Sequence, residues 1–187
     1  MNGPIATIDT SVLLSLQCTG VVGTVSVLFS RLLVPIAVSN EIEAGGQRNL
    51  AVTQALAEYA IFESCTDYDR AVVEFLLQER AQRAEGKDQG EAEAVAQAAQ
   101  RSANMVLVDD ALGRTWADAM SIECHDTLWI FEQLRLNGYL TELRPHFAQL
   151  IRHRRRQPVA VMNDLLKKFD EPVITDEDFR LWGLAPL

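Results

Sequence analysis

The chain has 187 residues, of which 48% are hydrophobic and 23% charged, a composition typical of a folded globular protein with a sizeable core. Its 26 acidic and 17 basic residues give a net charge of -9, which argues against binding nucleic acid by bulk attraction of phosphate. The charge does not exclude an enzyme whose carboxylates hold a cation.

The predicted elements alternate along the chain. Short apolar, β-branched runs predict strands at residues 4–9, 32–38, 61–64, 105–108 and 121–124. Helical patterns lie at residues 11–17, 24–32, 39–46, 50–60, 67–84, 88–100, 111–119 and 127–152. Because the strands are separated by helices, the sequence predicts an α/β fold with a parallel sheet covered on both faces.

The last part of the chain has a different character. The charged run "IRHRRRQP" at residues 151–158 ends in a proline and marks a boundary between a domain at 1–150 and an extension at 151–187. The extension is predicted to form two helices, at 159–169 and 175–184. Thr175 and Asp178 have the spacing of a capping box at the start of the second.

Acidic residues directly follow two of the predicted strands. Asp9 follows "IATI", and Asp109 and Asp110 follow "MVLV". In a parallel α/β sheet, ligands bind beyond the carboxyl ends of the strands, so we expect these acids to converge. The alternative for each is a structural role as the N-cap of the next helix.

The stretch "KDQGEAEAVAQAAQ" at residues 87–100 raises the same choice. Asp88 and Glu91 have the spacing of a capping box, which is a structural explanation. Helical geometry, however, places Glu91 on the apolar face and Glu93 on a polar stripe with Gln97. A buried carboxylate needs a partner, and oxygen ligands suit Mg²⁺ or Mn²⁺.

Glu41, in "VPIAVSNEI", lies just past the second predicted strand. Taken alone, it is typical of a solvated helix acid. Four acids nevertheless share strand-exit or helix-entry positions: Asp9, Glu41, Glu91 and Asp110. The shared pattern is more specific than any single member, and crowding predicts raised carboxyl pKa values.

These segments together resemble a PIN domain over roughly residues 5 to 145. "IDTSVLLSL" and "VPIAVSNEI" are similar to its first two motifs. "DQGEAEAVAQAA" is similar to the "DxGExEAIxLA" helix of one prokaryotic branch, and "VLVDDALGR" to the acid-bearing strand that follows. "IECHDTLWIFEQLRLNGYL" resembles the closing segment of that branch.

The resemblance implies a three-layer α/β/α sandwich and a metal-dependent ribonuclease site, as in the toxins of toxin–antitoxin pairs. Four positions match the family's acids: Asp9, Glu41, Glu91 and Asp110. Ser11 matches a supporting polar residue, and the neighbours Asp109 and Glu93 are further candidate metal ligands. In this interpretation, one or two Mg²⁺ or Mn²⁺ ions activate water for attack on a phosphodiester.

The chain departs from the family pattern at three positions. Asp126 replaces the glycine that precedes Thr127, and Val108 stands where many relatives have threonine. Gln97 replaces an apolar helix residue. The four acids are unaffected by these departures.

Positive charge for substrate phosphates is predicted at four arginines: Arg114, Arg152, Arg154 and Arg155. The alternatives are a solvated surface at the end of a helix for the last three, and an ion pair between Arg114 and Asp110.

The family resemblance implies partners, and the composition of the chain predicts a compartment. The family implies an RNA substrate, an antitoxin protein and a homodimer. Three widely spaced cysteines predict reduced thiols, and no apolar run reaches about 18 residues, so we expect a cytoplasmic protein with no membrane span.

Two other functions are open. The first is an inactive PIN-like module that binds nucleic acid or protein, which the net charge and the extension favour and the complete acid set disfavours. The second is a phosphate-ester hydrolase of another α/β fold. Its usual motif needs an aspartate two residues after Asp9, where this chain has Ser11.

Overall fold

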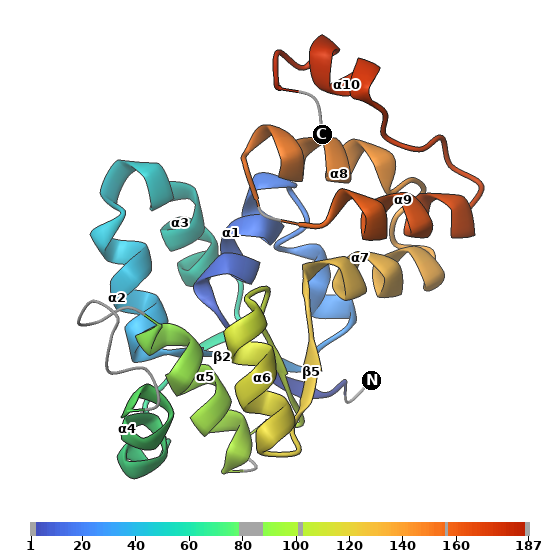
Figure 1. Ribbon diagram of the computed structural model, residues 1–187. Helices are drawn as coiled ribbons and strands as arrows, with labels where there is room; N and C mark the ends of the chain where they lie inside the picture. Colours follow the sequence, from blue (N-terminus) through green and yellow to red (C-terminus); the bar gives the residue numbers. More distant parts are fainter. Residues whose placement is uncertain (1–2, 79–87, 101–102, 156, 186–187) are drawn as a thin grey trace. The chain divides into compact units, whose positions relative to one another are not determined.

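The computed structural model describes residues 3–78, 88–100, 103–155 and 157–185 (Figure 1). The chain divides into two compact units, Met1–Thr127 (unit 1) and Leu128–Leu187 (unit 2). The boundary predicted near residue 150 falls inside helix α8 (Arg144–Arg152), and the division into domains at 1–150 and 151–187 stays a prediction. Residues 79–84 of the helix predicted at 67–84 lie outside the described residues.

Unit 1 is built on a parallel sheet of five strands in the order β3-β2-β1-β4-β5. The strands are β1 (Ile5–Ile8), β2 (Arg31–Pro35), β3 (Phe62–Cys65), β4 (Met105–Leu107) and β5 (Glu123–His125). β1 and β4 are almost fully buried, as expected for central strands covered on both faces.

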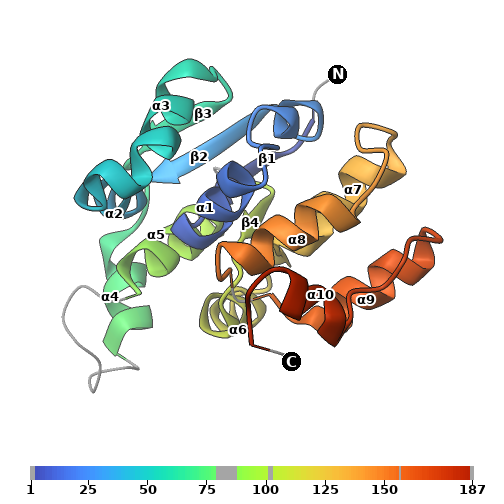
Figure 2. The ribbon, with the colours of Figure 1, turned by 90° about the horizontal axis from the view of Figure 1, so that it is seen from above.

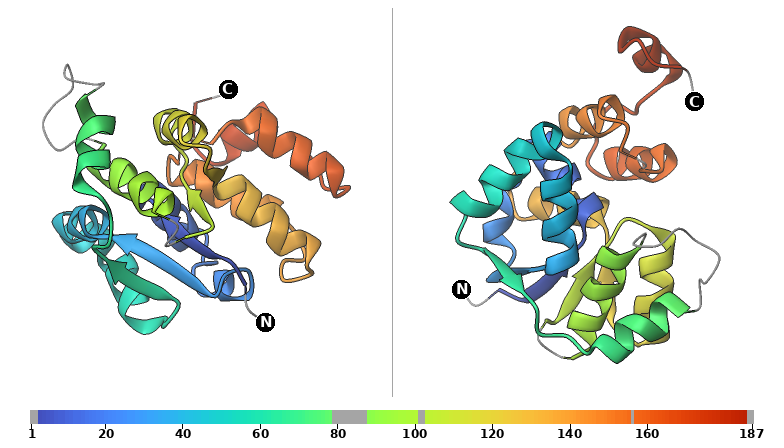
Figure 3. Two further views of the ribbon diagram at one scale, coloured as in Figure 1. Left: turned by 90° about the horizontal axis from the view of Figure 1, so that it is seen from below. Right: turned by 90° about the vertical axis from the view of Figure 1, so that its left-hand side faces the viewer.

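Helices lie on both sides of this sheet. In chain order they are α1 (Thr10–Cys18), the 3₁₀ helix η1 (Thr24–Val27), α2 (Ile36–Ala44), the 3₁₀ helix η2 (Gly46–Asn49), α3 (Leu50–Glu58), α4 (Arg70–Gln78), α5 (Gln89–Ala99) and α6 (Ala111–Ala119). Seen from below, α5 and α6 lie in front of the strands (Figure 3, left), whereas from above α1 lies in front of them (Figure 2). The fold is therefore the predicted three-layer α/β/α sandwich.

Three element boundaries differ from the prediction. The strand predicted at 32–38 ends at Pro35, and Ile36 already begins α2, because proline has no N–H for the ladder and its fixed φ suits a helix start. The helix predicted at 24–32 is only the short η1, which contains several β-branched residues. The last strand is Glu123–His125 rather than 121–124, and it follows Ser121 at φ 55°.

Helix α5 is buried on nearly all sides. It packs against α2, α4, α6 and strands of the sheet, and the hydroxyl of Thr7 on β1 donates to the Ala94 carbonyl at 2.9 Å. The predicted polar stripe is wrong, because Glu93 is 3% exposed and Gln97 is fully buried. Small alanines allow close packing around this helix.

Unit 2 is helical. Its helices are α7 (Thr127–Leu136, which begins at the last residue of unit 1), α8 (Arg144–Arg152), α9 (Val159–Lys168) and α10 (Asp176–Leu181). Phe131 and Phe147 are fully buried and meet edge to face, with ring centroids 5.8 Å apart. The predicted capping box is confirmed: Asp178 accepts hydrogen bonds from the backbone N–H and the hydroxyl of Thr175.

All three cysteines carry free thiols. Within the described ranges, none of the helices has the length and apolar character needed to cross a membrane.

Candidate active site

The order of the strands fixes where a site forms. The chain leaves β1 towards β2 and β3 on one side, and β4 and β5 lie on the other, so the topological switch point lies between β1 and β4. Ligands of such sheets bind beyond the carboxyl ends of the strands at this point. Asp9 and Asp110 follow these two strands, and the backbone N–H of Asp9 donates to the Leu107 carbonyl at the end of β4.

Asp9 is the N-cap of α1 and is only 4% exposed. Its Oδ2 atom accepts hydrogen bonds from the backbone N–H and the hydroxyl of Ser11, at 3.0 and 2.5 Å. Burial raises the pKa of Asp9 from 3.8 to about 6, against the lowering effect of the Ser11 hydrogen bonds and with a smaller upward contribution from Glu41. Ser11 therefore holds the carboxylate of Asp9 in place with two hydrogen bonds.

Asp110 is the N-cap of α6, and its Oδ1 atom accepts from the backbone N–H of Leu112 at 2.8 Å. The structural alternative is thus confirmed for Asp110, and its role in the site stays a prediction. A carboxylate has two oxygens, and the capping bond of Asp110 uses one of them.

Glu91 lies in the first turn of α5. Its Oε2 atom is buried and has no hydrogen-bond partner within the described part of the chain. Burial, followed by the charges of Asp9, Asp110, Asp88 and Glu41, raises the pKa of Glu91 from 4.5 to about 8. The four predicted acids, Asp9, Glu41, Glu91 and Asp110, form an acid cluster whose members act on one another electrostatically. Glu91 has the largest pKa shift among them.

Glu41 on α2 is fixed by one hydrogen bond and lies close to the backbone of α5. The hydroxyl of Thr10 donates to Glu41 Oε2 at 2.5 Å, which joins the start of α1 to the second half of α2. A Cβ atom at Gly90 would lie 3.1 Å from both Glu41 Oε1 and Val38 Cγ2. The glycine of the helix motif thus allows α5 to approach the carboxylate closely.

Glu93 links the helices that carry Glu91 and Glu41. Its Oε2 atom accepts from the backbone N–H of Ala37 at 2.9 Å, and its Oε1 atom from the side-chain amide of Gln89 at 2.8 Å. Helix α2 has no capping side chain of its own, so Glu93 satisfies one of its free N–H groups from α5. This arrangement gives Glu93 a positioning role and leaves its predicted metal ligation without geometric support.

Asp109 has a comparable structural role. Thr127 donates to it from its backbone N–H at 2.9 Å and from its hydroxyl at 2.8 Å. The hydroxyl of Ser15 on α1 is 3.4 Å from Oδ2 of the same carboxylate. Asp109 therefore ties the end of β4 to α1 and to the start of α7, and Asp110 is the better placed of the two for the site.

The predicted capping box at α5 is not formed. Asp88 is the N-cap residue but has φ 71°, and its side chain makes no capping hydrogen bond. Glu91 is therefore not the reciprocal partner of a cap, which leaves its carboxylate directed to the acid cluster.

The four predicted substrate arginines fall in different parts of the chain. Arg114 pairs with Asp126 at 3.3 Å, so the predicted alternative of a pair with Asp110 is wrong. Asp126, one of the departures from the family pattern, thereby gains a partner. Arg152, Arg154 and Arg155 lie in unit 2, and their role in substrate binding stays a prediction.

The acid cluster has the chemistry of a divalent-cation site. Its donors are carboxylate oxygens, and the buried, unpartnered Oε2 of Glu91 would gain a partner in a cation. No three His, Cys, Asp or Glu side chains in the described ranges are arranged to enclose a metal ion.

Comparison with known proteins agrees with this geometry. The family model DUF3368, a PIN domain, matches residues 5–171. The chain belongs to the PIN-domain family. No curated protein and no solved structure matches it. PIN domains are generally nucleases that use divalent metal ions, so the chain has a nuclease-type fold.

Sequence reasoning missed two contributors to the site. Neither Thr10 nor Gly90 was predicted to take part in the site. A glycine inside a helix lowers its stability and is a signal of close packing, which would have pointed to Gly90. The bond from Thr10 to Glu41 spans 31 positions and has no local signal.

Proposed function

We propose that this PIN-domain protein is an endoribonuclease that hydrolyses RNA phosphodiester bonds with Mg²⁺ or Mn²⁺. The observation that carries the proposal is the buried Oε2 of Glu91, which has no partner in the described residues and lies among the charges of Asp9, Asp110 and Glu41. Such a carboxylate is costly to ionise unless a cation is bound.

The residues that would hold the cation belong to the set Asp9, Asp110 and Glu91, of which one or two carboxylates together with water would suffice for Mg²⁺. A bound divalent ion supplies Lewis acidity and lowers the pKa of water. The chain's own residues determine where this happens: Ser11 fixes the carboxylate of Asp9, and Leu112 fixes that of Asp110. Glu41, held by Thr10, faces the same cluster and favours positive charge there.

The first test is cleavage of a mixed single-stranded RNA pool in the presence of Mg²⁺ or Mn²⁺. Asp9→Asn protein and wild type in EDTA are the controls, and we expect both to be inactive. If wild type and Asp9→Asn are equally inert and calorimetry detects no Mn²⁺ binding, the proposal fails and an inactive binding module becomes the better interpretation.

A role as a toxin is a finer part of the proposal. Induced expression of wild type should arrest growth of a host cell, and Asp9→Asn should not. Rescue by a protein encoded beside it would supply the antitoxin that the family resemblance implies. Cleavage without growth arrest would retain the nuclease and remove the toxin role.

A further inference from the structure

The two units differ in charge. Unit 1 carries 18 acidic and 8 basic residues, whereas unit 2 carries 8 acidic and 9 basic residues. A polyanion is therefore repelled by unit 1 as a whole, apart from any bound cation. Unit 2 has a near balance of charge and does not oppose an RNA chain in this way.

Unit 2 uses part of this charge to hold itself together. Four of its basic residues are in ion pairs with acids of the same unit: Arg135 with Glu171, Arg144 with Asp178, Lys167 with Asp164 and Lys168 with Glu132. Arg152 and Arg154, at the end of α8, are exposed and form no ion pair within the described residues. These two guanidinium groups are therefore available to a ligand.

Arg152 has an aromatic side chain behind it. Its guanidinium carbon lies 5.4 Å from the ring centroid of Trp182, which in turn lies 5.9 Å from the ring of Phe179. A guanidinium group is a planar cation, and such planes stack on unpaired bases in protein–RNA complexes. A solvated arginine that only favours the helix C-terminus needs no such backing.

Arg154 follows Arg152 by two positions and has an unusual backbone conformation. Its φ is 54°, a left-handed value that glycine most often adopts at a helix end. The turn is closed by hydrogen bonds from Arg154 N–H to the Ile151 carbonyl and from Arg155 N–H to the Leu150 carbonyl, both at 2.9 Å. The helix ends at Arg152, and Arg154 is exposed two residues further on. Arg155 is less exposed and has a buried Nε atom.

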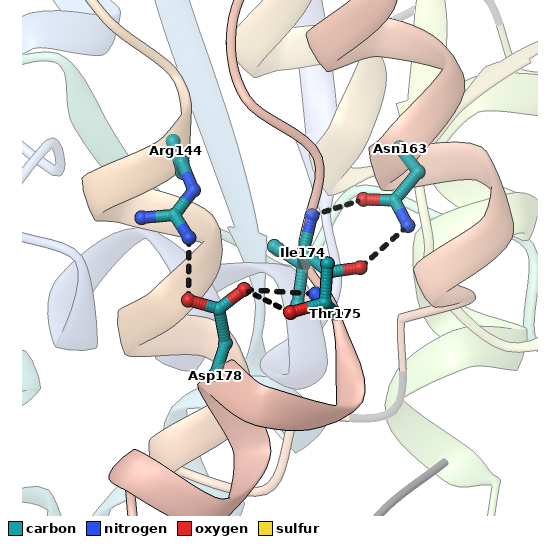
Figure 4. Close-up of polar contacts among 5 residues, drawn as sticks. All are labelled: Arg144, Asn163, Ile174, Thr175 and Asp178. Atoms are coloured by element: carbon teal, nitrogen blue, oxygen red, sulfur yellow. Dashed lines mark hydrogen bonds and ion pairs between the residues drawn. The ribbon is translucent and has the colours of Figure 1, made fainter.

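Helix α10, which precedes Trp182, is fixed within unit 2 (Figure 4). Arg144 at the start of α8 donates to Asp178 at 2.5 Å, and Asp178 also accepts from Thr175. Asn163 on α9 exchanges two hydrogen bonds with the backbone of Ile174, at 2.8 and 2.9 Å. The pair of Arg152 and Trp182 is thus preorganised rather than formed by two mobile side chains.

We propose that Arg152, Arg154 and Trp182 form a binding platform for single-stranded RNA. A base stacks on the guanidinium plane of Arg152, which Trp182 holds in place, and Arg154 contacts the adjacent phosphates. The platform deepens the proposed function, because it offers exposed positive charge to an RNA substrate of a chain whose unit 1 is strongly acidic. Trp182 follows the end of the family match at residue 171, so the platform is not a feature of the matched domain alone.

The test is the affinity for a fluorescein-labelled uridine dodecamer, measured by anisotropy over a range of salt concentrations. Asp9→Asn protein and wild type in EDTA prevent cleavage during the measurement. Arg152→Lys keeps the charge and loses the plane, so it should weaken binding at least about fivefold with the salt dependence unchanged. Arg154→Ala should lower the slope of log affinity against log salt by about 0.7.

The matched control is the double variant Lys167→Ala/Lys168→Ala, which removes two positive charges from ion pairs elsewhere in unit 2. Its RNA affinity should stay close to that of wild type. Equal binding by the control and by Arg152→Lys would overturn the platform. If polyglutamate displaces the dodecamer as well as unlabelled dodecamer does, the platform is overturned in favour of an acidic polypeptide ligand. If duplex RNA binds as tightly as the single strand, the platform for unpaired bases is overturned as well.

The same assays separate this inference from the proposed function. If wild type cleaves RNA while the Arg152 and Arg154 variants bind and cleave normally, the nuclease stands and the platform fails. If the variants lose RNA binding while wild type cleaves nothing in Mg²⁺ or Mn²⁺, the platform stands and the nuclease fails.

Discussion

The acid cluster of unit 1 and two carboxylates of unit 2, Asp178 and Glu171, lie in opposite surroundings. In unit 1, burial and neighbouring acids raise the pKa of Asp9 to about 6 and that of Glu91 to about 8. In unit 2, hydrogen bonds from the Thr175 backbone and from Arg144 hold the pKa of Asp178 below its ordinary value. The acids of unit 2 therefore stabilise their fold, whereas the acid cluster of unit 1 stores a repulsion that a cation would relieve.

Glu171 illustrates the same contrast. Both of its oxygens accept from the backbone N–H of Leu143 at 2.8 Å, and Oε2 also accepts from that of Arg144. The carboxylate thus satisfies free N–H groups at the start of α8, where the helix dipole favours negative charge. Its counterpart in unit 1, Glu91, has an oxygen that is buried with no partner in the described residues.

The largest expected effect is that of Glu91→Gln, which should separate activity from stability. We expect RNA cleavage to fall by at least about 100-fold, because a residue that would hold the cation is lost. In metal-free buffer at pH 8 the same substitution should raise Tm, because it removes a buried charge among acids. Cleavage rates and calorimetric scans measure the two effects.

The matched control for Glu91→Gln is Glu43→Gln on α2, an exposed carboxylate near the same cluster in sequence. It should change neither rate nor Tm appreciably. A lower Tm for Glu91→Gln in metal-free buffer would show that the carboxylate stabilises the fold of unit 1. The difference between the acids of the two units would then be wrong.

In unit 2, Glu171→Gln should have the opposite effect on stability. It replaces a charged acceptor of backbone N–H groups by a neutral one, and we expect a loss of about 1–3 kcal/mol in the free energy of unfolding. Urea denaturation measures this loss, with the exposed Glu177→Gln on α10 as control. Unchanged stability in Glu171→Gln would remove the distinction drawn between the two sets of acids.

A smaller effect is expected at Thr10, whose hydroxyl holds Glu41. Thr10→Val keeps the shape and loses the hydrogen bond, so Mn²⁺ affinity should fall about tenfold, as for other residues that orient a ligand shell. Thr10→Ser keeps the hydroxyl and should restore most of the affinity. Calorimetric titration distinguishes the two variants. Equal affinities would mean that Glu41 needs no support from Thr10.

The sequence predicted the sheet and the position of two acids at its edge, because those features have local signals. The helix at 111–119 was predicted with its observed bounds, since an aspartate cap precedes a clear amphipathic pattern. Asp9 and Asp110 were placed together because parallel strands end at one edge of the sheet.

Other features depend on contacts between distant segments. The apolar run "LLVPIAV" has no periodicity that separates strand from helix, so the start of α2 was placed too late. Glu93 was assigned to a polar stripe because its partner, the N–H of Ala37, lies 56 positions away. Neither the burial of α5 on all sides nor the cap that it supplies to α2 has a signal within its own sequence.

The two units are also expected to differ in the pH dependence of their stability. The pKa of Glu91 is raised from 4.5 to about 8 in the fold, so the native state binds more protons than the unfolded chain between these values. Stability of unit 1 should therefore fall as pH rises from about 5 to 8 and level off above it. Asp178 has a lowered pKa, so its contribution to unit 2 is present above 3.8 and is lost only as pH falls below that value.

Hydrogen exchange at pH 5, 6.5 and 8, corrected for intrinsic exchange rates, measures both units in one experiment. Amides of β1 and α5 should lose protection as pH rises, and amides of α8 and α10 should not. Because a divalent cation competes with protons for the same carboxylates, Mg²⁺ should restore protection in unit 1 more at pH 8 than at pH 5. If amides of both units lose protection in parallel as pH rises, the acid cluster is not the titrating element. If the protection by Mg²⁺ weakens as pH rises, Mg²⁺ does not act through these carboxylates.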